Sequence, residues 1–261
     1  MDDQSKYAIH AACREGKLSL VQSLLNVDPK LSQRKDDDGR LPIHWAASAN
    51  QLDIVQLLAE EKGFDVDVQD DMGWTALMIA ASVKDSERLV EFLLSKGADP
   101  NEKSKLTTPT IQPPIIPSSY TSIHHTPFPQ RSYPTVVHFV ASKNAIDIAR
   151  RLFDNQPPAS ARVRDRRGQY ALHRAAAVGS VPMVNLLLKH KSPLNATDQD
   201  GQTALHHAIA EGHGDTAVAL LKAGAETDKK DVDGHLALDL APAKEIKQYI
   251  ERMAENEGIE L

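Results

Sequence analysis

The sequence predicts an all-α solenoid built from tandem pairs of helices, and two observations carry this prediction. A segment of the type LPIHWAAS (residues 41–48) recurs along nearly the whole chain of 261 residues, and most copies precede an amphipathic segment such as DIVQLLAE (53–60). Each copy with its follower indicates a short helix and then a second helix. Because one such pair cannot enclose a core by itself, every pair must pack on its neighbours.

The spacing of the copies identifies the type of repeat. The copies are YAIHAAC (7–13), LPIHWAAS (41–48), TALMIAAS (75–82), TVVHFVAS (135–142), YALHRAAA (170–177), TALHHAIA (203–210) and LALDLA (236–241). Measured at the histidine position, successive copies lie 34, 34, 60, 35, 33 and 33 residues apart. Five of the six intervals are close to the ankyrin period of about 33 residues. The expected repeats are about 3–36, 37–69, 70–103, 133–164, 165–197, 198–230 and 231–261.

The connections between repeats carry turn signals. Most copies follow a D-x-x-G motif: Asp36/Gly39, Asp70/Gly73, Asp165/Gly168, Asp198/Gly201 and Asp231/Gly234. Aspartate and glycine are typical of tight turns, and in this repeat type they predict short β-hairpin fingers. The last element, 242–255, is expected to be a polar-faced capping helix. The expected fold class is therefore an all-α ankyrin-repeat solenoid of seven repeats with short β-hairpin fingers, forming one domain over 1–261.

One interval is longer than the others by about 26 residues. The extra segment, 104–132, is rich in proline, serine and threonine and has no apolar period. Such a composition predicts a disordered loop at the tip of a finger. A loop of this length is either functional or tolerated by the fold, and we expect it to be tolerated.

Composition limits the classes of function. The net charge of −6 and the isoelectric point near 6.0 argue against nucleic acids and anionic membranes as general partners. The chain has a single cysteine, Cys13, and neither a run of 18 apolar residues nor a signal peptide. These features predict a cytoplasmic and nuclear protein, and we expect it to be a monomer when free.

The histidines do not predict a catalytic or metal site. His10, His44, His138, His173 and His206 occupy the same position in their repeats, where a ring can bond the backbone of a turn. A metal or catalytic site needs side chains that converge, whereas these are repeated by translation. With no phosphate loop, HExxH or GxSxG motif either, we expect no catalytic residue, no metal and no cofactor.

Variable positions in the repeat predict a partner-binding surface. The position after the histidine is Ala11, Trp45, Ile79, Phe139, Arg174, His207 and Leu240. The position before the first helix is Arg40, Trp74, Pro134, Gln169, Gln202 and His235. The adjacent helix position is almost always alanine, as at Ala46 and Ala80, which indicates tight helix packing. We interpret the variable positions as exposed on the concave face, with Trp45 as a binding anchor; the alternative is that Trp45 fills a gap between repeats.

Charged residues extend this predicted surface. Asp38 and Asp71 lie in the early fingers beside Arg40, whereas Lys143 and Arg174 lie in the middle of the chain. A partner with complementary charges would bind in a single register. The predicted partner-binding residues are Asp38, Arg40, Trp45, Asp71, Trp74, Ile79, Phe139, Lys143, Arg174 and His207.

The segments DGRLPIHWAASANQLDIVQLL, DDMGWTALMIAAS, VVHFVASKNAIDIA and YALHRAAAVGS resemble the gankyrin family of seven-repeat chaperones of proteasome assembly. The resemblance implies binding of the C-terminal domain of one ATPase subunit of the proteasome base through the concave face. By motif match it places the binding residues at Asp38, Arg40, Trp45, Asp71, Trp74, Lys143 and Arg174. The segment 104–132 is absent from the short animal form, so the resemblance implies no role for it.

Two other classes of function compete with this hypothesis. A generic ankyrin inhibitor of a kinase or transcription factor would use the same surface for a different partner. An enzyme is disfavoured because the repeats use up the chain and leave no room for a catalytic domain.

Overall fold

The computed structural model describes residues 7–104 and 134–261, and within these ranges it is helical without strands. The elements are α2 (Ala8–Arg14), α3 (Leu18–Val27), η1 (Pro29–Gln33), α4 (Pro42–Ser48), α5 (Leu52–Leu58), α6 (Ala76–Ala80), α7 (Glu87–Ser95), α8 (Val136–Lys143), α9 (Ile146–Asp154), α10 (Ala171–Val178), α11 (Val181–Lys189), α12 (Ala204–Ala210), α13 (Gly214–Lys222), η2 (Ala237–Leu240) and α14 (Lys244–Asn256).

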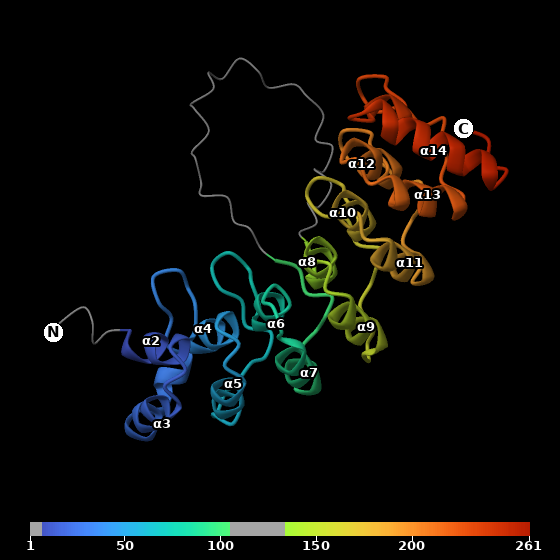
Figure 1. The fold of residues 1–261 in the computed structure, drawn as a ribbon. Helices are drawn as coiled ribbons and strands as arrows, with labels where there is room; N and C mark the ends of the chain where they lie inside the picture. Colours follow the sequence, from blue (N-terminus) through green and yellow to red (C-terminus); the bar gives the residue numbers. More distant parts are fainter. Residues whose placement is uncertain (1–6, 105–133) are drawn as a thin grey trace, which may run out of the picture.

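The helices form a curved stack of two layers (Figure 1). The inner layer contains α2, α4, α6, α8, α10 and α12, and the outer layer contains α3, α5, α7, α9, α11 and α13. Alanines such as Ala46, Ala80 and Ala175 are fully buried between the layers. Their small side chains let neighbouring inner helices approach closely, which explains why this position hardly varies.

The repeated histidine can connect an inner helix to the next repeat, as His44 and His173 do. The Nδ1 atom of His44 accepts a hydrogen bond from the Leu41 backbone N–H at 3.0 Å, and Nε2 lies 3.1 Å from the Val68 and Trp74 carbonyl oxygens. His173 makes the same two kinds of bond. A neutral imidazole ring can make both kinds of bond, with Nδ1 as the acceptor and Nε2–H as the donor. These bonds give the repeated histidine the structural role that its spacing predicts.

The expected β-hairpin fingers are not strands in the described residues, where the only ladder contact is an isolated bridge between Lys230 and Leu236. Each D-x-x-G motif instead closes a loop of five residues, here called a finger loop: 36–40, 70–74, 165–169, 198–202 and 231–235. In the loop 165–169, Asp165 Oδ1 accepts the backbone N–H groups of Arg167 and Gln169, both at 2.9 Å. The carboxylate thus takes the place of a strand ladder.

The long interval interrupts one finger loop at its tip. The Ser104 N–H donates to the Pro134 carbonyl oxygen at 3.4 Å, the same bond that closes the other finger loops between their first and fifth residues. The Ser104 hydroxyl donates to the Met72 carbonyl oxygen at 3.3 Å, and this serine is buried. The predicted disorder of 104–132 concerns residues 105–132, which lie outside the described residues. The base of the loop is nevertheless closed like the others.

We expect that replacing Lys105 to Tyr133 by Asp-Asp-Gly will leave the melting temperature unchanged or slightly higher. The three residues restore the tip of the finger loop 36–40 between Ser104 and Pro134, with glycine at the position where Gly39 has a φ of +69°. Closing a shorter loop also costs less entropy, although the dependence on length is weak. Thermal unfolding followed by circular dichroism measures the effect. A clear drop in melting temperature would show that the deleted segment packs on the solenoid.

The C-terminal helix α14 covers the end of the stack. Ile250 is fully buried in the core, and Ile246 and Tyr249 pack against it, as the i, i+3, i+4 pattern predicts. Among the described residues, no helix is long and apolar enough to span a membrane.

Candidate protein-binding surface

The second oxygen of the finger-loop aspartate receives a side-chain donor from the inner helix nine residues later. Trp45 Nε1 donates to Asp36 Oδ2 at 2.7 Å, and Arg174 Nη2 donates to Asp165 Oδ2 at 2.6 Å. A third repeat has the same bond, from His207 Nε2 to Asp198 Oδ2 at 2.9 Å. The variable position after the histidine therefore supplies an N–H donor in these three repeats.

This result corrects the interpretation that chemical variety at this position reports exposure alone. Trp45 is partly buried, and the side chain of Arg174 is 24% exposed. Tryptophan, arginine and histidine differ in size and charge but share the N–H group that the aspartate needs. The constant nine-residue spacing from Asp to an N–H donor is the sequence signal that would have revealed the bond.

In one repeat the inner helix has no side-chain donor for the finger-loop aspartate, and the preceding finger loop supplies the donor instead. Ile79 occupies the same repeat position, is only 8% exposed, and cannot donate. Arg40 Nε donates instead to Asp70 Oδ2 at 3.0 Å, from one finger loop to the next. The structure thus places Ile79 in the core, contrary to its predicted place on the partner-binding surface.

An aromatic pair stands at the interrupted finger loop. The rings of Trp74 and Phe139 lie 4.4 Å apart at an angle of 32°, and both are partly buried. Ser104 occupies the aspartate position of this loop, and phenylalanine cannot donate to it. Ring packing therefore replaces the carboxylate bond between these two repeats, so Trp74 and Phe139 have a structural role in addition to any contact with a partner.

Trp45 lies in a pocket of about 270 Å³ at the first two repeats. The pocket lining is Tyr7, His10, Ala11, Arg14, Asp36, Asp37, Asp38 and Trp45. The guanidinium groups of Arg14 and Arg40 lie 5.7 Å and 5.3 Å from the centre of the Trp45 ring, within cation–π range. Burial raises the pKa of Asp36, but the bonds from Trp45 and the Arg40 and Asp38 N–H groups outweigh it and lower the pKa below its ordinary value. The carboxylate is therefore charged at neutral pH.

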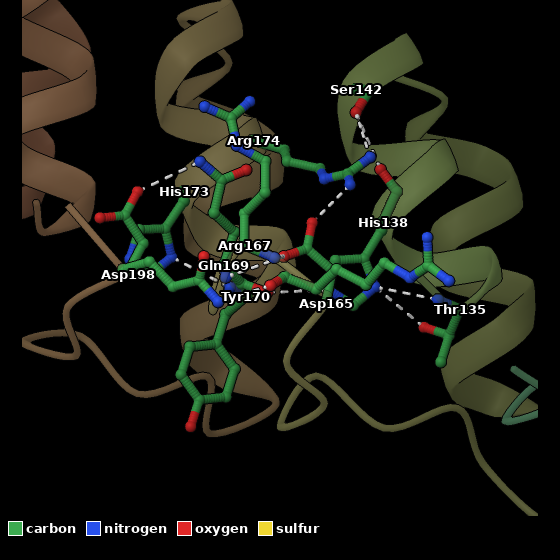
Figure 2. A network of polar contacts seen from close by, with 12 residues as sticks. Thr135, His138, Ser142, Asp165, Arg167, Gln169, Tyr170, His173, Arg174 and Asp198 are labelled. Carbon is green, nitrogen blue, oxygen red and sulfur yellow. Dashed lines mark hydrogen bonds and ion pairs between the residues drawn. The ribbon is translucent and has the colours of Figure 1, made fainter. Parts of the chain in front are cut away.

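The charged members of the predicted surface fall into two groups. Asp38 and Asp71 are exposed on adjacent finger loops, joined by a bond from the Asp71 N–H to the Asp38 carbonyl oxygen at 3.1 Å. Arg174 reaches from Asp165 towards Ser142 on α8, with Nη1 3.4 Å from the Ser142 hydroxyl (Figure 2). Lys143, exposed at the end of α8, lines a pocket of about 450 Å³ between the α6–α7 turn and the α8–α9 turn. The acidic group thus lies near Trp45, and the basic group lies further along the stack.

One group of side chains in the described ranges has spacing suited to a metal ion: Asp231, Asp233 and His235, whose ligand atoms lie within 4.8 Å of one another. Asp231 Oδ1 already accepts the N–H groups of Asp233 and His235, at 3.0 and 2.8 Å. Closure of the finger loop accounts for this cluster without a metal.

Comparisons with known proteins agree with the fold. A family model described as ankyrin repeats in three copies matches residues 5–104 and 135–231. Among solved structures, the human ASB11 ankyrin repeat domain has a TM-score of 0.73 at 19% identity, covering 94% of this chain and 96% of that one. The ankyrin repeat domain of Bcl-3 has a TM-score of 0.66 at 22% identity, covering 93% of this chain and 97% of that one. At these identities the structures show the shared fold alone.

Relatives found by sequence comparison identify the family more narrowly than the solved structures do. The probable 26S proteasome regulatory subunit p28 of Saccharomyces cerevisiae is 36% identical over 185 residues, which cover 70% of this chain and 69% of the yeast protein. The 26S proteasome non-ATPase regulatory subunit 10 of Dictyostelium discoideum is 37% identical over 84 residues, which cover 32% of this chain and 36% of that protein. The repeats that build the finger loops and the Trp45 pocket thus belong to an ankyrin-repeat protein of the gankyrin family, the family of yeast p28.

Proposed function

We propose that this chain is a non-catalytic chaperone for assembly of the proteasome regulatory particle, and that it binds the C-terminal domain of a base ATPase subunit. The observation that carries the proposal is the relationship to yeast p28, whose name describes a proteasome regulatory subunit. The ATPase partner follows from the resemblance of the motifs around Trp45, Trp74 and Arg174. We further infer seven repeats, the last being η2 with α14, and a monomer that acts in the cytoplasm and nucleus.

The geometry supports different roles for the residues of the concave face, here called the inner surface. Arg40 and Arg174 already pair with Asp70 and Asp165, which hold the two guanidinium groups in place. A partner carboxylate would therefore share each guanidinium group with an aspartate of this chain. Lys143 has no ion pair with any described residue, so it can give its full charge to a partner. Trp45 would contribute apolar contact beside Asp38 and Asp71, which would face basic side chains of the ATPase domain.

A generic ankyrin inhibitor of a kinase or transcription factor remains the second candidate. Its only specific support is the shared fold with the Bcl-3 domain, a member of the IkappaB protein family. Affinity capture of the tagged chain from its native cells, followed by mass spectrometry, separates the two. We expect base ATPase subunits with the wild-type chain and their loss with Trp45→Ala combined with Lys143→Glu. Recovery of a kinase or transcription factor without base subunits would refute the proposal.

A further inference from the structure

Positive charge is concentrated in one part of the chain. Residues 134–197 contain ten Lys or Arg and three Asp or Glu, whereas the whole chain has 30 basic and 36 acidic residues. The segment therefore has a net charge of +7 within a protein of net charge −6. Some of these cations belong to the inner surface, as Lys143 and Arg174 do, but others lie at the ends of the outer helices.

Three cationic side chains and a histidine line a pocket of about 340 Å³ at the end of α11, here called the α11 pocket. Its lining is Pro158, Ala159, Ser160, Ala161, Arg162, Lys189, His190 and Lys191. Arg162, Lys189 and Lys191 are exposed, and no carboxylate contributes to the lining. The α11 pocket thus combines positive charge with a small apolar floor made by Ala159 and Ala161.

Hydrogen bonds hold the walls of the α11 pocket. Asn101 fixes one wall, since its side chain accepts the Ser160 N–H at 2.8 Å and donates to the Pro158 carbonyl oxygen at 3.1 Å. Arg162 Nη1 joins the two walls by donating to the Lys191 carbonyl oxygen at 3.2 Å. A site with fixed walls binds a ligand with less loss of conformational entropy than a mobile one.

Lys191 has a backbone conformation that favours glycine. Its φ is +61°, and the residues at the corresponding turn after α7 and α13 are Gly97 and Gly224, with φ of +91° and +90°. A left-handed conformation strains a residue that carries a Cβ, and such strain often marks a functional position. Here the strained residue adds a cation to the α11 pocket.

We propose that the α11 pocket binds an acidic segment of a protein partner, with consecutive Asp or Glu side chains facing Arg162, Lys189 and Lys191. The pocket belongs to a row of loops connected by hydrogen bonds, and its neighbours in that row are acidic. Asp67 bonds the Asp99 N–H on one side, and Asn195 bonds Glu226 on the other. These carboxylates would repel an extended polyanion such as RNA, whereas a short acidic peptide segment fits between them. This site is separate from the inner surface and does not depend on the proposed proteasomal partner.

The test uses the full chain and a fluorescein-labelled oligoglutamate peptide, with binding measured by fluorescence anisotropy at low salt. Lys191→Gly removes one cation while restoring the residue that the other repeats use, so the melting temperature should stay the same or rise. We expect the affinity for the peptide to fall by about fivefold, the upper range for one exposed ion pair. Arg162→Glu combined with Lys189→Glu should reduce it further.

Lys96→Glu is the matched control, because Lys96 is exposed at the end of the outer helix α7, outside the pocket. Its effect should be less than twofold, the scale of a screened, distant surface charge. An equal loss for Lys96→Glu and Lys191→Gly would overturn the proposal in favour of general electrostatic attraction. So would a single-stranded oligonucleotide or inorganic phosphate that binds more tightly than the peptide and is lost in Lys191→Gly, because the natural ligand would then not be an acidic protein segment.

Discussion

Replacing Asp165 by alanine should lower the free energy of unfolding by about 3 kcal/mol or more. Asp165 is 5% exposed and accepts three hydrogen bonds, from the Arg167 and Gln169 N–H groups and from Arg174 Nη2 (Figure 2). The substitution leaves two backbone donors without their acceptor and a largely buried guanidinium without its counter-charge. Urea denaturation at neutral pH measures the change.

Asp231→Ala is the control for this prediction. Asp231 closes its finger loop with the same two backbone bonds, but its neighbour His235 is more than half exposed, and no arginine in the described part of the chain pairs with Asp231. We expect a smaller loss of stability there. A loss of less than about 1 kcal/mol for Asp165→Ala, the typical net value of a single hydrogen bond, would show that the carboxylate is not a main support of the finger loop.

Lowering the pH from 7 to 5 should destabilise the fold through its buried histidines. Burial is the main cause that lowers the pKa of His138 and of His173 from 6.5 to about 4; the charge of Arg174 adds to the effect at His138 and that of His207 at His173. The unfolded chain therefore binds protons between pH 6.5 and 4 that the folded chain rejects. The stability from these rings is fully present above pH 6.5 and is lost as the pH falls towards 4. At pH 5 the free energy of unfolding is lower by about 2 kcal/mol for each ring.

Urea denaturation at pH 7 and pH 5, with NMR titration of the histidine rings, measures this effect. His173→Asn should be less stable than wild type at pH 7 but should lose less stability on acidification. Titration of His138 and His173 near pH 6.5 in the folded protein would contradict the prediction.

The helical repeats could be predicted from the sequence because their signals are local and periodic. The 33–35-residue spacing, the alanines and the repeated histidine each report a contact that recurs in the same form, as His44 and His173 show. The finger loops lie where the sequence predicts them, but without strands in the described residues, because Asp165 and its counterparts satisfy the backbone groups that a strand ladder would use.

The binding surface was less predictable because one physical role can be filled by different residues. Trp45 and Arg174 have unlike side chains, yet both donate to an aspartate nine residues earlier. Variety among the repeats therefore did not distinguish a side chain bonded to its own repeat from one available to a partner. The contact between Trp74 and Phe139 spans the long interval in the chain, so periodicity gave no signal for it.

The most direct test of the proposed function is the affinity of this chain for the isolated C-terminal domain of the base ATPase subunit, measured by isothermal titration calorimetry. Trp45→Ala should weaken binding by on the order of 2 kcal/mol, the scale of an interface hot spot. Trp45→Phe separates the ring from the bond to Asp36, and circular dichroism confirms folding of each variant. Lys143→Glu should weaken binding by several kcal/mol in the worst case, by placing like charges together.

A reciprocal acid-to-base change in the ATPase domain should restore part of the affinity of the Lys143→Glu variant. Lys62→Glu, at an exposed position after the outer helix α5, is the control and should bind like wild type. We expect a loss of affinity for Trp45→Ala and Lys143→Glu and a partial recovery of affinity in the charge swap. If both variants bind the domain as tightly as the wild-type chain, the partner does not use the inner surface and the assignment is wrong.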